Sequence, residues 1–243
     1  MKRLFDIFAS FIGLIIATPV LLPVIFLVWY QDKNSPFYIA PRVGKGERLF
    51  NMVKLRSMVI NADRSGVDST SANDSRITSV GNFIRKYKLD EITQLWNVLL
   101  GDMSLVGPRP NIERETTLYT IKEKRLFSVK PGITDFASIV FSDEGKILEN
   151  CDDPDLAYNQ LIRPWKSRLG LFYINNQSFI LDLQIICFTI IGLIKRDIAL
   201  NWISCKLDKL GAEKKLVKIV LRNCELQPYF PPGSKRIVTS RYI

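Results

Sequence analysis

The sequence predicts an α+β fold in which an N-terminal membrane helix precedes a mostly helical domain with a small sheet. Three observations lead to this prediction. An uncharged apolar run fills residues 7–30, strand-like segments flank a Gly-Lys-Gly turn within residues 35–58, and apolar residues recur at helical spacing from residue 89 onward. We therefore expect a membrane segment at 1–32, a domain at 33–202 and a basic extension at 203–243.

The N-terminal run is long enough to cross a bilayer. Its 24 residues, Ile7 to Tyr30, carry no charge, and as a straight helix they would span roughly 36 Å. Thr18 and Pro19 lie at the centre of the run. We expect a kink there, because proline removes a backbone donor and clashes with the preceding turn. The Thr18 hydroxyl is able to bond a carbonyl that the kink frees.

Basic residues flank this run on both sides and leave its orientation open. Lys2 and Arg3 precede it, and Lys33 and Arg42 follow it, so an excess of positive charge on cytoplasmic loops selects neither orientation. One topology is a kinked helix that crosses the membrane. The other is a hairpin of helix, break and helix that enters and leaves on the cytoplasmic side, where both basic flanks would then lie.

The remaining chain alternates between helical patterns and turns. Apolar residues at 89, 92, 96 and 99 share one helix face, and Gly101 ends that helix. A Gly-Pro-Arg-Pro turn follows at 107–110. We expect three more helices over residues 111–127, 152–169 and 178–194. Asp182 and Gln184 interrupt the last of these, so it is expected to be a core or interfacial helix rather than a span.

The tail after Trp202 is strongly basic. It holds nine Lys and Arg against three Asp and Glu, which supplies six of the ten net positive charges of the chain. Its apolar residues, which include Leu207, Val217 and Val220, are able to form one face of a helix. Such a segment suits either an anionic membrane surface or a solvated helix packed on the domain, and the sequence leaves both open.

The composition excludes several classes of catalytic site. The chain has no histidine, which removes Ser-His-Asp and Cys-His catalysis and any histidine-ligated metal. Its four cysteines form no Cys-x-x-Cys pair and indicate neither a zinc site nor a disulfide framework. The net charge of +10 favours anionic partners such as phosphate esters or anionic lipid. We expect no nucleic acid as a partner, because no module of interleaved aromatic and basic residues is recognisable.

One acidic pair among basic residues is the strongest candidate for chemistry. Asp90 and Glu91 begin the helical pattern, and Arg85 and Arg109 lie on either side of them in the sequence. Arginine binds phosphate oxygens in a bidentate manner, while a carboxylate holds Mg²⁺ or attacks phosphorus. Taken alone, the pair has a structural alternative, in which Asp90 caps the helix and Glu91 stabilises its first turn.

Several segments of the chain form a recognisable set of motifs. They are KRLFD at 2–6, the Thr18-Pro19 break, KLRSM at 54–58, DSRIT at 74–78, LDE at 89–91, QLWNV at 94–98, GDMSLVGPRP at 101–110 and KPGIT at 130–134. With these motifs the sequence resembles the monotopic phosphoglycosyl transferases, the small single-domain bacterial sugar transferases, over roughly residues 1–195. The GDMSLVGPRP segment matches that family without change. The chain departs from the usual family residues at Lys88, Thr93 and Asp135.

The resemblance implies an enzyme that transfers a sugar 1-phosphate from a UDP-sugar to polyprenol (undecaprenyl) phosphate and releases UMP. This reaction is the first membrane step of bacterial glycoconjugate assembly. By the same resemblance Asp90 is the nucleophile of an aspartyl-phosphosugar intermediate, and Glu91 is a metal ligand or an acid–base group. Mg²⁺ is the expected cofactor, held near Asp90 and Glu91.

The resemblance also implies which residues contact the substrate. Arg85 and Arg109 are the expected phosphate clamps, and Pro108 and Pro110 are expected to fix the loop around the uridine phosphate. The weaker candidates for substrate binding are Lys54, Arg56 and Arg76.

The implied chemistry places the enzyme at a membrane. A UDP-sugar is cytosolic and polyprenol phosphate lies at the membrane surface, so residues 33–202 are expected to form a catalytic domain on the cytoplasmic face of the bacterial inner membrane. We then favour the re-entrant hairpin for residues 1–32, with interfacial amphipathic helices in the domain.

Two alternative functions stay open: a membrane-associated glycosyltransferase that releases UDP, and a non-enzymatic basic membrane adaptor. The sugar, the glycan pathway and the oligomeric state are not readable from these motifs.

Overall fold

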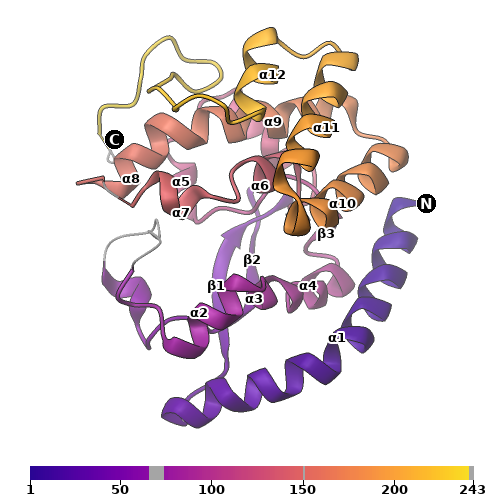
Figure 1. The fold of residues 1–243 in the computed structure, drawn as a ribbon, viewed down its shortest axis with the longest axis vertical. Coiled ribbons are helices and arrows are strands. Elements are labelled where there is room, and N and C mark those ends of the chain that lie inside the picture. The colour runs from indigo at the N-terminus through magenta and orange to yellow at the C-terminus, as the bar shows by residue number, and fades with distance from the viewer. Residues whose placement is uncertain (66–73, 150, 241–243) are drawn as a thin grey trace.

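The uncharged run folds as one helix, α1 (Lys2–Asp32). In the computed structural model, which describes residues 1–65, 74–149 and 151–240, α1 lies along the outside of the molecule and bends at its middle (Figure 1). Pro19 and Pro23 lie inside the helix and explain the bend, because neither offers an amide to the preceding turn. The predicted break is therefore a bend within a helix that continues through it.

The Thr18 hydroxyl reinforces this bend in a way that differs from the prediction. Thr18 Oγ1 donates to the carbonyl of Leu14 at 2.7 Å. The carbonyl that loses its usual amide partner at Pro19 is that of Ile15, one residue further along, because helical hydrogen bonds join residues four apart. The hydroxyl thus bonds the preceding turn without replacing the amide that proline lacks.

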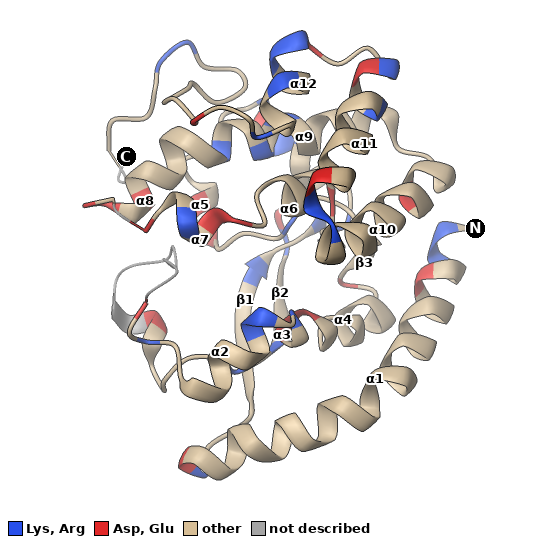
Figure 2. Ribbon diagram, viewed as in Figure 1, with Lys and Arg blue, Asp and Glu red and all other residues tan. Residues whose placement is uncertain are grey.

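Both ends of α1 are fixed to the same folded domain. At the N-terminal end, Lys2 Nζ donates to Asp182 Oδ2 at 2.6 Å. At the C-terminal end, Arg56 Nη2 donates to Asp32 Oδ1 at 2.7 Å. Between these anchors the helix carries charged side chains only near its ends (Figure 2). Its outward face is apolar, with Phe11, Ile16 and Phe26 exposed.

The β part consists, among the described residues, of two small sheets. β1 (Phe37–Val43) pairs antiparallel with β2 (Leu49–Leu55) around the predicted Gly-Lys-Gly turn. Gly46 in this turn has a φ of 68°, a conformation that glycine adopts at little cost. β3 (Ser104–Val106) pairs in parallel with β4 (Gly132–Thr134). The predicted small sheet is confirmed.

Short helices make up most of the remaining structure. After η1 (Lys45–Glu47) they are η2 (Ala62–Ser65), α2 (Ser79–Lys86), α3 (Leu89–Ile92), α4 (Leu95–Leu100), α5 (Glu113–Thr116), η3 (Glu123–Ser128), α6 (Phe136–Val140), α7 (Glu144–Ile147), α8 (Pro154–Ala157), the short π-helix η4 (Tyr158–Ile162), α9 (Arg163–Asn176), α10 (Phe179–Ile194), α11 (Arg196–Lys209) and α12 (Lys214–Val220).

The helix predictions are confirmed in most places and wrong in one. The helix expected at 178–194 is α10, and the one expected at 152–169 lies in the consecutive elements α8, η4 and α9. The helix expected at 89–99 is divided into α3 and α4. The helix expected at 111–127 is wrong, because only α5 and the 3-10 turn η3 form there. Between these two elements, Thr120 bonds instead to the distant carbonyl of Pro232.

The main core lies among α6, α9, α10, α11 and α12. Leu207, Leu216 and Val220 of the basic tail belong to it and are buried, and burial of each such side chain contributes about 2 kcal/mol. The expected boundary at residue 203 falls inside α11. The tail helices thus pack on the domain, which agrees with the second of the two alternatives for the tail, a solvated helix packed on the domain.

A second, smaller core attaches α1 to the rest of the molecule. Val28 of α1 packs with Leu55 of β2 and Ile84 of α2, and all three are at most 1% exposed. α3 contributes Leu89 to the same cluster. Helix α1 and the elements around residues 54–91 therefore form one packed unit, which fixes α3 relative to β2.

Candidate active site

The candidate nucleophile lies on the short helix α3. Lys88 begins this helix in the left-handed conformation with φ 55°, and Asp90 and Glu91 occupy its first turn. The Thr93 hydroxyl lies 3.1 Å from the carbonyl of Asp90 and 3.2 Å from that of Val53, and the second contact joins α3 to β2. No side chain caps the start of α3. The alternative in which Asp90 caps the helix is therefore wrong.

Asp90 lies beside a lysine whose side chain is only 20% exposed. Lys54 Nζ of β2 is 3.8 Å from Asp90 Oδ2. Asp90 Oδ1 is also buried, and among the described residues no group hydrogen bonds to it. Because a buried carboxylate oxygen without a partner is costly, this atom is a candidate for ligand contact. Burial, helped by the charge of Arg109, lowers the pKa of Lys54 to about 8 despite the opposing carboxylates.

Glu91 is paired with Arg109. Arg109 Nη2 donates to Glu91 Oε1 at 2.8 Å. Burial opposes ionisation of Glu91, but the charges of Arg109 and Lys54 outweigh it and lower the pKa of Glu91 to about 2. The same pairing raises the pKa of Arg109. Both groups are therefore ionised at neutral pH, and Lys54, Asp90, Glu91 and Arg109 form one charged cluster.

A tight backbone contact presents Arg109 to this cluster. Gly107 N donates to the Thr134 carbonyl, and Gly132 N donates to the Pro108 carbonyl, both at 3.0 Å. A Cβ atom on Gly132 would lie 2.1 Å from Gly107 N. The approach of the two backbones therefore requires glycine. The loop that carries Arg109 is fixed on the β3–β4 pair.

A pocket lies directly beside this loop. It is a shallow hollow of about 290 Å³ when the adjoining open solvent is counted, and Arg109 lines it together with Pro108 and Pro110. Tyr119 and Phe127 supply aromatic side chains to its lining, and their rings stack with centroids 5.7 Å apart. The other lining residues are Val43, Gly44, Asn111, Leu126, Val129 and Pro131. The sequence predicts that Pro108 and Pro110 lie near the uridine phosphate, but no motif in the sequence indicates that Tyr119 and Phe127 line the same pocket.

The other predicted basic residues have different surroundings. Arg56 is buried and held by Asp32 at the end of α1. Arg76 forms a two-point contact with Asp74, at 2.9 Å and 2.6 Å. Arg85 is partly exposed on α2, and its charge, after that of Arg76, lowers the pKa of Asp74. The structure thus brings Lys54 and Arg109 to the Asp90–Glu91 pair and gives Arg56 and Arg76 other carboxylate partners.

Arg42 is a basic residue that sequence reasoning assigned only to the membrane flank. The strand register places Tyr38 opposite Lys54, and alternation along β1 puts Arg42 on the same sheet face as Tyr38. The charge of Arg42 contributes, after burial and Arg109, to the lowered pKa of Lys54. Strand alternation over residues 37–43 is the signal that would have linked Arg42 to the site.

Two adjacent carboxylates are the candidate metal ligands. Within residues 1–65, 74–149 and 151–240, no three side chains of Asp, Glu, His or Cys group closely enough to hold a metal. Mg²⁺ in phosphoryl-transfer sites commonly takes one or two carboxylates together with substrate phosphates. The adjacent carboxylates of Asp90 and Glu91 in the first turn of α3 fit this second type of site, in which the substrate completes the ligand set.

Comparison with known proteins assigns these motifs to one family. The family model described as "Bacterial sugar transferase" matches residues 1–196. The chain is 36% identical over 190 residues to the uncharacterized sugar transferase EpsL of Bacillus subtilis, a match that covers 78% of this chain and 85% of the relative.

Two longer relatives carry more specific names. One is the UDP-galactose-lipid carrier transferase of Erwinia amylovora, 34% identical over 212 residues, which cover 81% of this chain and 41% of the relative. The other is the UDP-N-acetylgalactosamine-undecaprenyl-phosphate N-acetylgalactosaminephosphotransferase of Aeromonas hydrophila, 34% identical over 197 residues, with 78% and 43% covered. This chain thus spans less than half the length of these two relatives.

Proposed function

Because the chain belongs to the bacterial sugar transferase family, we propose that it transfers a sugar 1-phosphate from a UDP-sugar to undecaprenyl phosphate and releases UMP. Membership of the family confirms the resemblance and the expectation of a transferase enzyme. The relatives from Erwinia and Aeromonas, whose names include a UDP-sugar donor and a lipid acceptor, support this choice of substrates. The observation that carries the proposal is the cluster around Asp90.

Asp90 is the proposed nucleophile. Its carboxylate attacks the sugar-side phosphorus of the UDP-sugar, a bond forms between Asp90 oxygen and that phosphorus, and the bond to the bridging oxygen breaks as UMP leaves. A phosphate oxygen of undecaprenyl phosphate then attacks the same phosphorus and releases the Asp90 carboxylate. The buried Oδ1 without a hydrogen-bond partner supports this role, because a nucleophile needs a free lone pair.

The neighbouring charges are assigned to the phosphates. Arg109 lies between Glu91 and the pocket, so it is placed to contact the donor diphosphate while its prolines hold the loop around the uridine phosphate. Lys54 supplies a further positive charge beside Asp90, and Arg85 stays a candidate clamp on α2. Asp90 and Glu91 would hold Mg²⁺, which when bound neutralises diphosphate charge.

The proposed location is the cytoplasmic face of the bacterial inner membrane, with α1 as a re-entrant helix. Lys2 and Asp32 dock opposite ends of α1 on the same domain, and a helix that crossed the bilayer would separate its ends by the membrane thickness. α10 is the proposed interfacial helix, because Ile180, Ile190 and Leu193 are each more than half exposed.

Labelling of an engineered cysteine tests this topology. A Met1→Cys variant, with the four native cysteines replaced by serine, should react with a membrane-impermeant maleimide only after the cytoplasmic side is opened. A cysteine introduced at the exposed Asp208 serves as the domain control. Reaction of position 1 from the periplasmic side alone would refute the re-entrant helix.

Analysis of the released nucleotide tests the reaction. Purified protein is incubated with Mg²⁺, undecaprenyl phosphate and each member of a panel of UDP-sugars. Release of UMP with at least one sugar supports the proposal. Release of UDP would identify the glycosyltransferase alternative instead, and the absence of turnover with every donor would favour the membrane adaptor.

A further inference from the structure

The C-terminal residues 226–238, here called the strap, lie beyond the part of the chain that the family model matches. They run across α9 and η4 without helix or strand and turn at Pro231–Ser234, where Ser234 N donates to the Pro231 carbonyl at 3.1 Å (Figure 1). Tyr229 N donates to the Gln160 carbonyl at 2.9 Å, and Gln160 Nε2 donates to the Val238 carbonyl at 2.7 Å. The ring of Tyr229 stacks on Trp165 with centroids 4.5 Å apart. The strap is therefore attached at several points.

The middle of the strap contacts the turn that precedes η3. Thr120 Oγ1 donates to the carbonyl of Pro232 and accepts from Glu123 N at 3.1 Å. Gly233 follows with a φ of 86°, and a Cβ atom on it would lie 2.9 Å from Lys122 Cβ and 3.1 Å from Thr120 Oγ1. Both the backbone conformation and the lack of space require glycine at this position.

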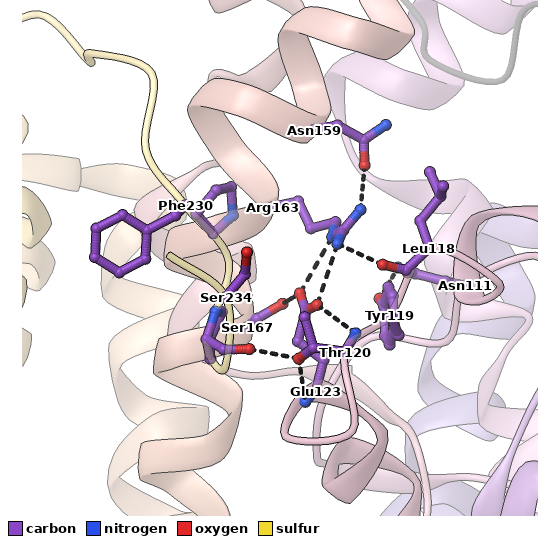
Figure 3. Close-up of polar contacts among 12 residues, drawn as sticks. Asn111, Leu118, Tyr119, Thr120, Glu123, Asn159, Arg163, Ser167, Phe230 and Ser234 are labelled. Carbon is purple, nitrogen blue, oxygen red and sulfur yellow. Dashed lines mark hydrogen bonds and ion pairs between the residues drawn. The ribbon is translucent and has the colours of Figure 1, made fainter. Parts of the chain in front are cut away.

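The same turn lies next to Tyr119, which together with Phe127 forms the aromatic side of the pocket, here called the wall. Glu123 is fully buried and accepts from Arg163 Nε at 3.1 Å and from Ser167 Oγ at 2.7 Å (Figure 3). The guanidinium of Arg163 lies 5.3 Å from the centre of the Tyr119 ring. Tyr119 in turn stacks on Phe127, and both line the pocket beside Arg109.

We propose that the strap positions this wall, through the contact of Pro232 and Gly233 with Thr120, so that the pocket keeps the shape that binds the nucleotide end of the donor. Thr120 and Gly233 are positioning residues, since neither lines the pocket. The part of the inference that concerns the donor rests on the proposed function. The part that concerns the wall rests on the contacts alone.

The test compares two glycine-to-alanine variants that share the same backbone penalty. Gly233→Ala forces a Cβ atom against Thr120 and Lys122, whereas Gly211 has a φ of 77° with nothing within 4 Å of the corresponding position. Hydrogen–deuterium exchange is measured over residues 118–128, and KM and kcat are measured for the UDP-sugar. Gly233→Ala should speed exchange in this segment and raise KM at least about three-fold with kcat nearly unchanged, while Gly211→Ala should alter neither.

A second pair of variants covers the case in which Gly233→Ala does not fold. Thr120→Val removes the hydroxyl and should reproduce the higher KM and faster exchange, and Thr120→Ser should restore both. Equal exchange and equal KM in the altered and control variants would overturn the proposal. If the wild-type protein released no UMP, the proposed function would fail, and the exchange comparison would still decide whether the strap holds the wall.

Discussion

Asp90 and Glu91 are adjacent in the chain but have different partners. Glu91 is bound to Arg109 at 2.8 Å, while Asp90 has Lys54 at 3.8 Å from one oxygen and no hydrogen-bond partner for the other among the described residues. Attack on phosphorus requires a free oxygen, and a strongly paired carboxylate is a poor nucleophile. The surroundings therefore distinguish two residues that the sequence alone presents as equivalent.

Replacement of Asp90 tests this distinction. Asp90→Asn keeps the size of the side chain but removes the carboxylate, so UMP release should fall at least about 1,000-fold with the thermal unfolding midpoint little changed. Asp208→Asn, at an exposed position on α11, is the matched control and should keep full activity. Turnover by Asp90→Asn close to the wild-type rate would contradict the assignment.

The lowered pKa of Lys54 predicts how activity depends on pH. Because this pKa is about 8, the ammonium is charged below pH 8 and neutral above it. We expect kcat/KM for the donor to fall as pH rises through 8, since the positive charge beside Asp90 is then lost. Lys54→Arg keeps its charge at all accessible pH values and should remove this fall. An identical alkaline profile in the variant would contradict the role of Lys54.

The structure gives a backbone conformation or a hydrogen-bond partner for each of the three residues that depart from the usual family pattern. Lys88 occupies the left-handed position that begins α3, and Thr93 bonds to β2. Asp135 accepts a hydrogen bond from Ser138 N at 2.7 Å and caps α6. The sequence identified these three positions as unusual but gave no role for them, because each role depends on a backbone conformation or on a partner supplied by the fold.

At the level of secondary structure, sequence patterns correctly predict those elements that depend mainly on neighbouring residues. The β1–β2 hairpin and α10 follow from turn residues and apolar spacing. The segment 111–127 was mispredicted because Thr120 and Glu123 bond across the fold to Pro232 and Arg163. The approach of Lys54 to Asp90 was likewise not readable, since it depends on how α3 packs on β2.

The buried ion pair between η3 and α9 should contribute strongly to stability. Glu123 and Arg163 side chains are 0% and 2% exposed, and removal of one partner leaves the other charged and buried. Glu123→Ala should therefore lower the free energy of unfolding by about 3 kcal/mol or more. The exposed pair of Glu47 with Lys124 provides the control, because Glu47→Ala should cost at most about 1 kcal/mol. Denaturant unfolding in detergent measures both, and equal losses would contradict the prediction.

For the molecule as a whole, the distribution of charge separates two regions. The basic residues of α12 lie at the end of the molecule opposite α1 (Figure 2), and the apolar side chains between them are buried in the main core. Six of the ten net positive charges lie in residues 203–243, whereas the cluster near Asp90 is balanced, with Lys54 and Arg109 against Asp90 and Glu91. The charge can be counted from the sequence, but only the fold shows that α12 lies at the opposite end of the molecule from the apolar helix α1 (Figure 2).

The most direct test of the proposed chemistry is the mass of the intact protein after incubation with a UDP-sugar and Mg²⁺ in the absence of undecaprenyl phosphate. The wild-type protein should gain the mass of one phosphosugar, peptide mapping should place it on Asp90, and one UMP should appear for each adduct. Asp90→Asn should gain nothing. Release of UDP without an adduct, or an adduct on a residue other than Asp90, would contradict the mechanism.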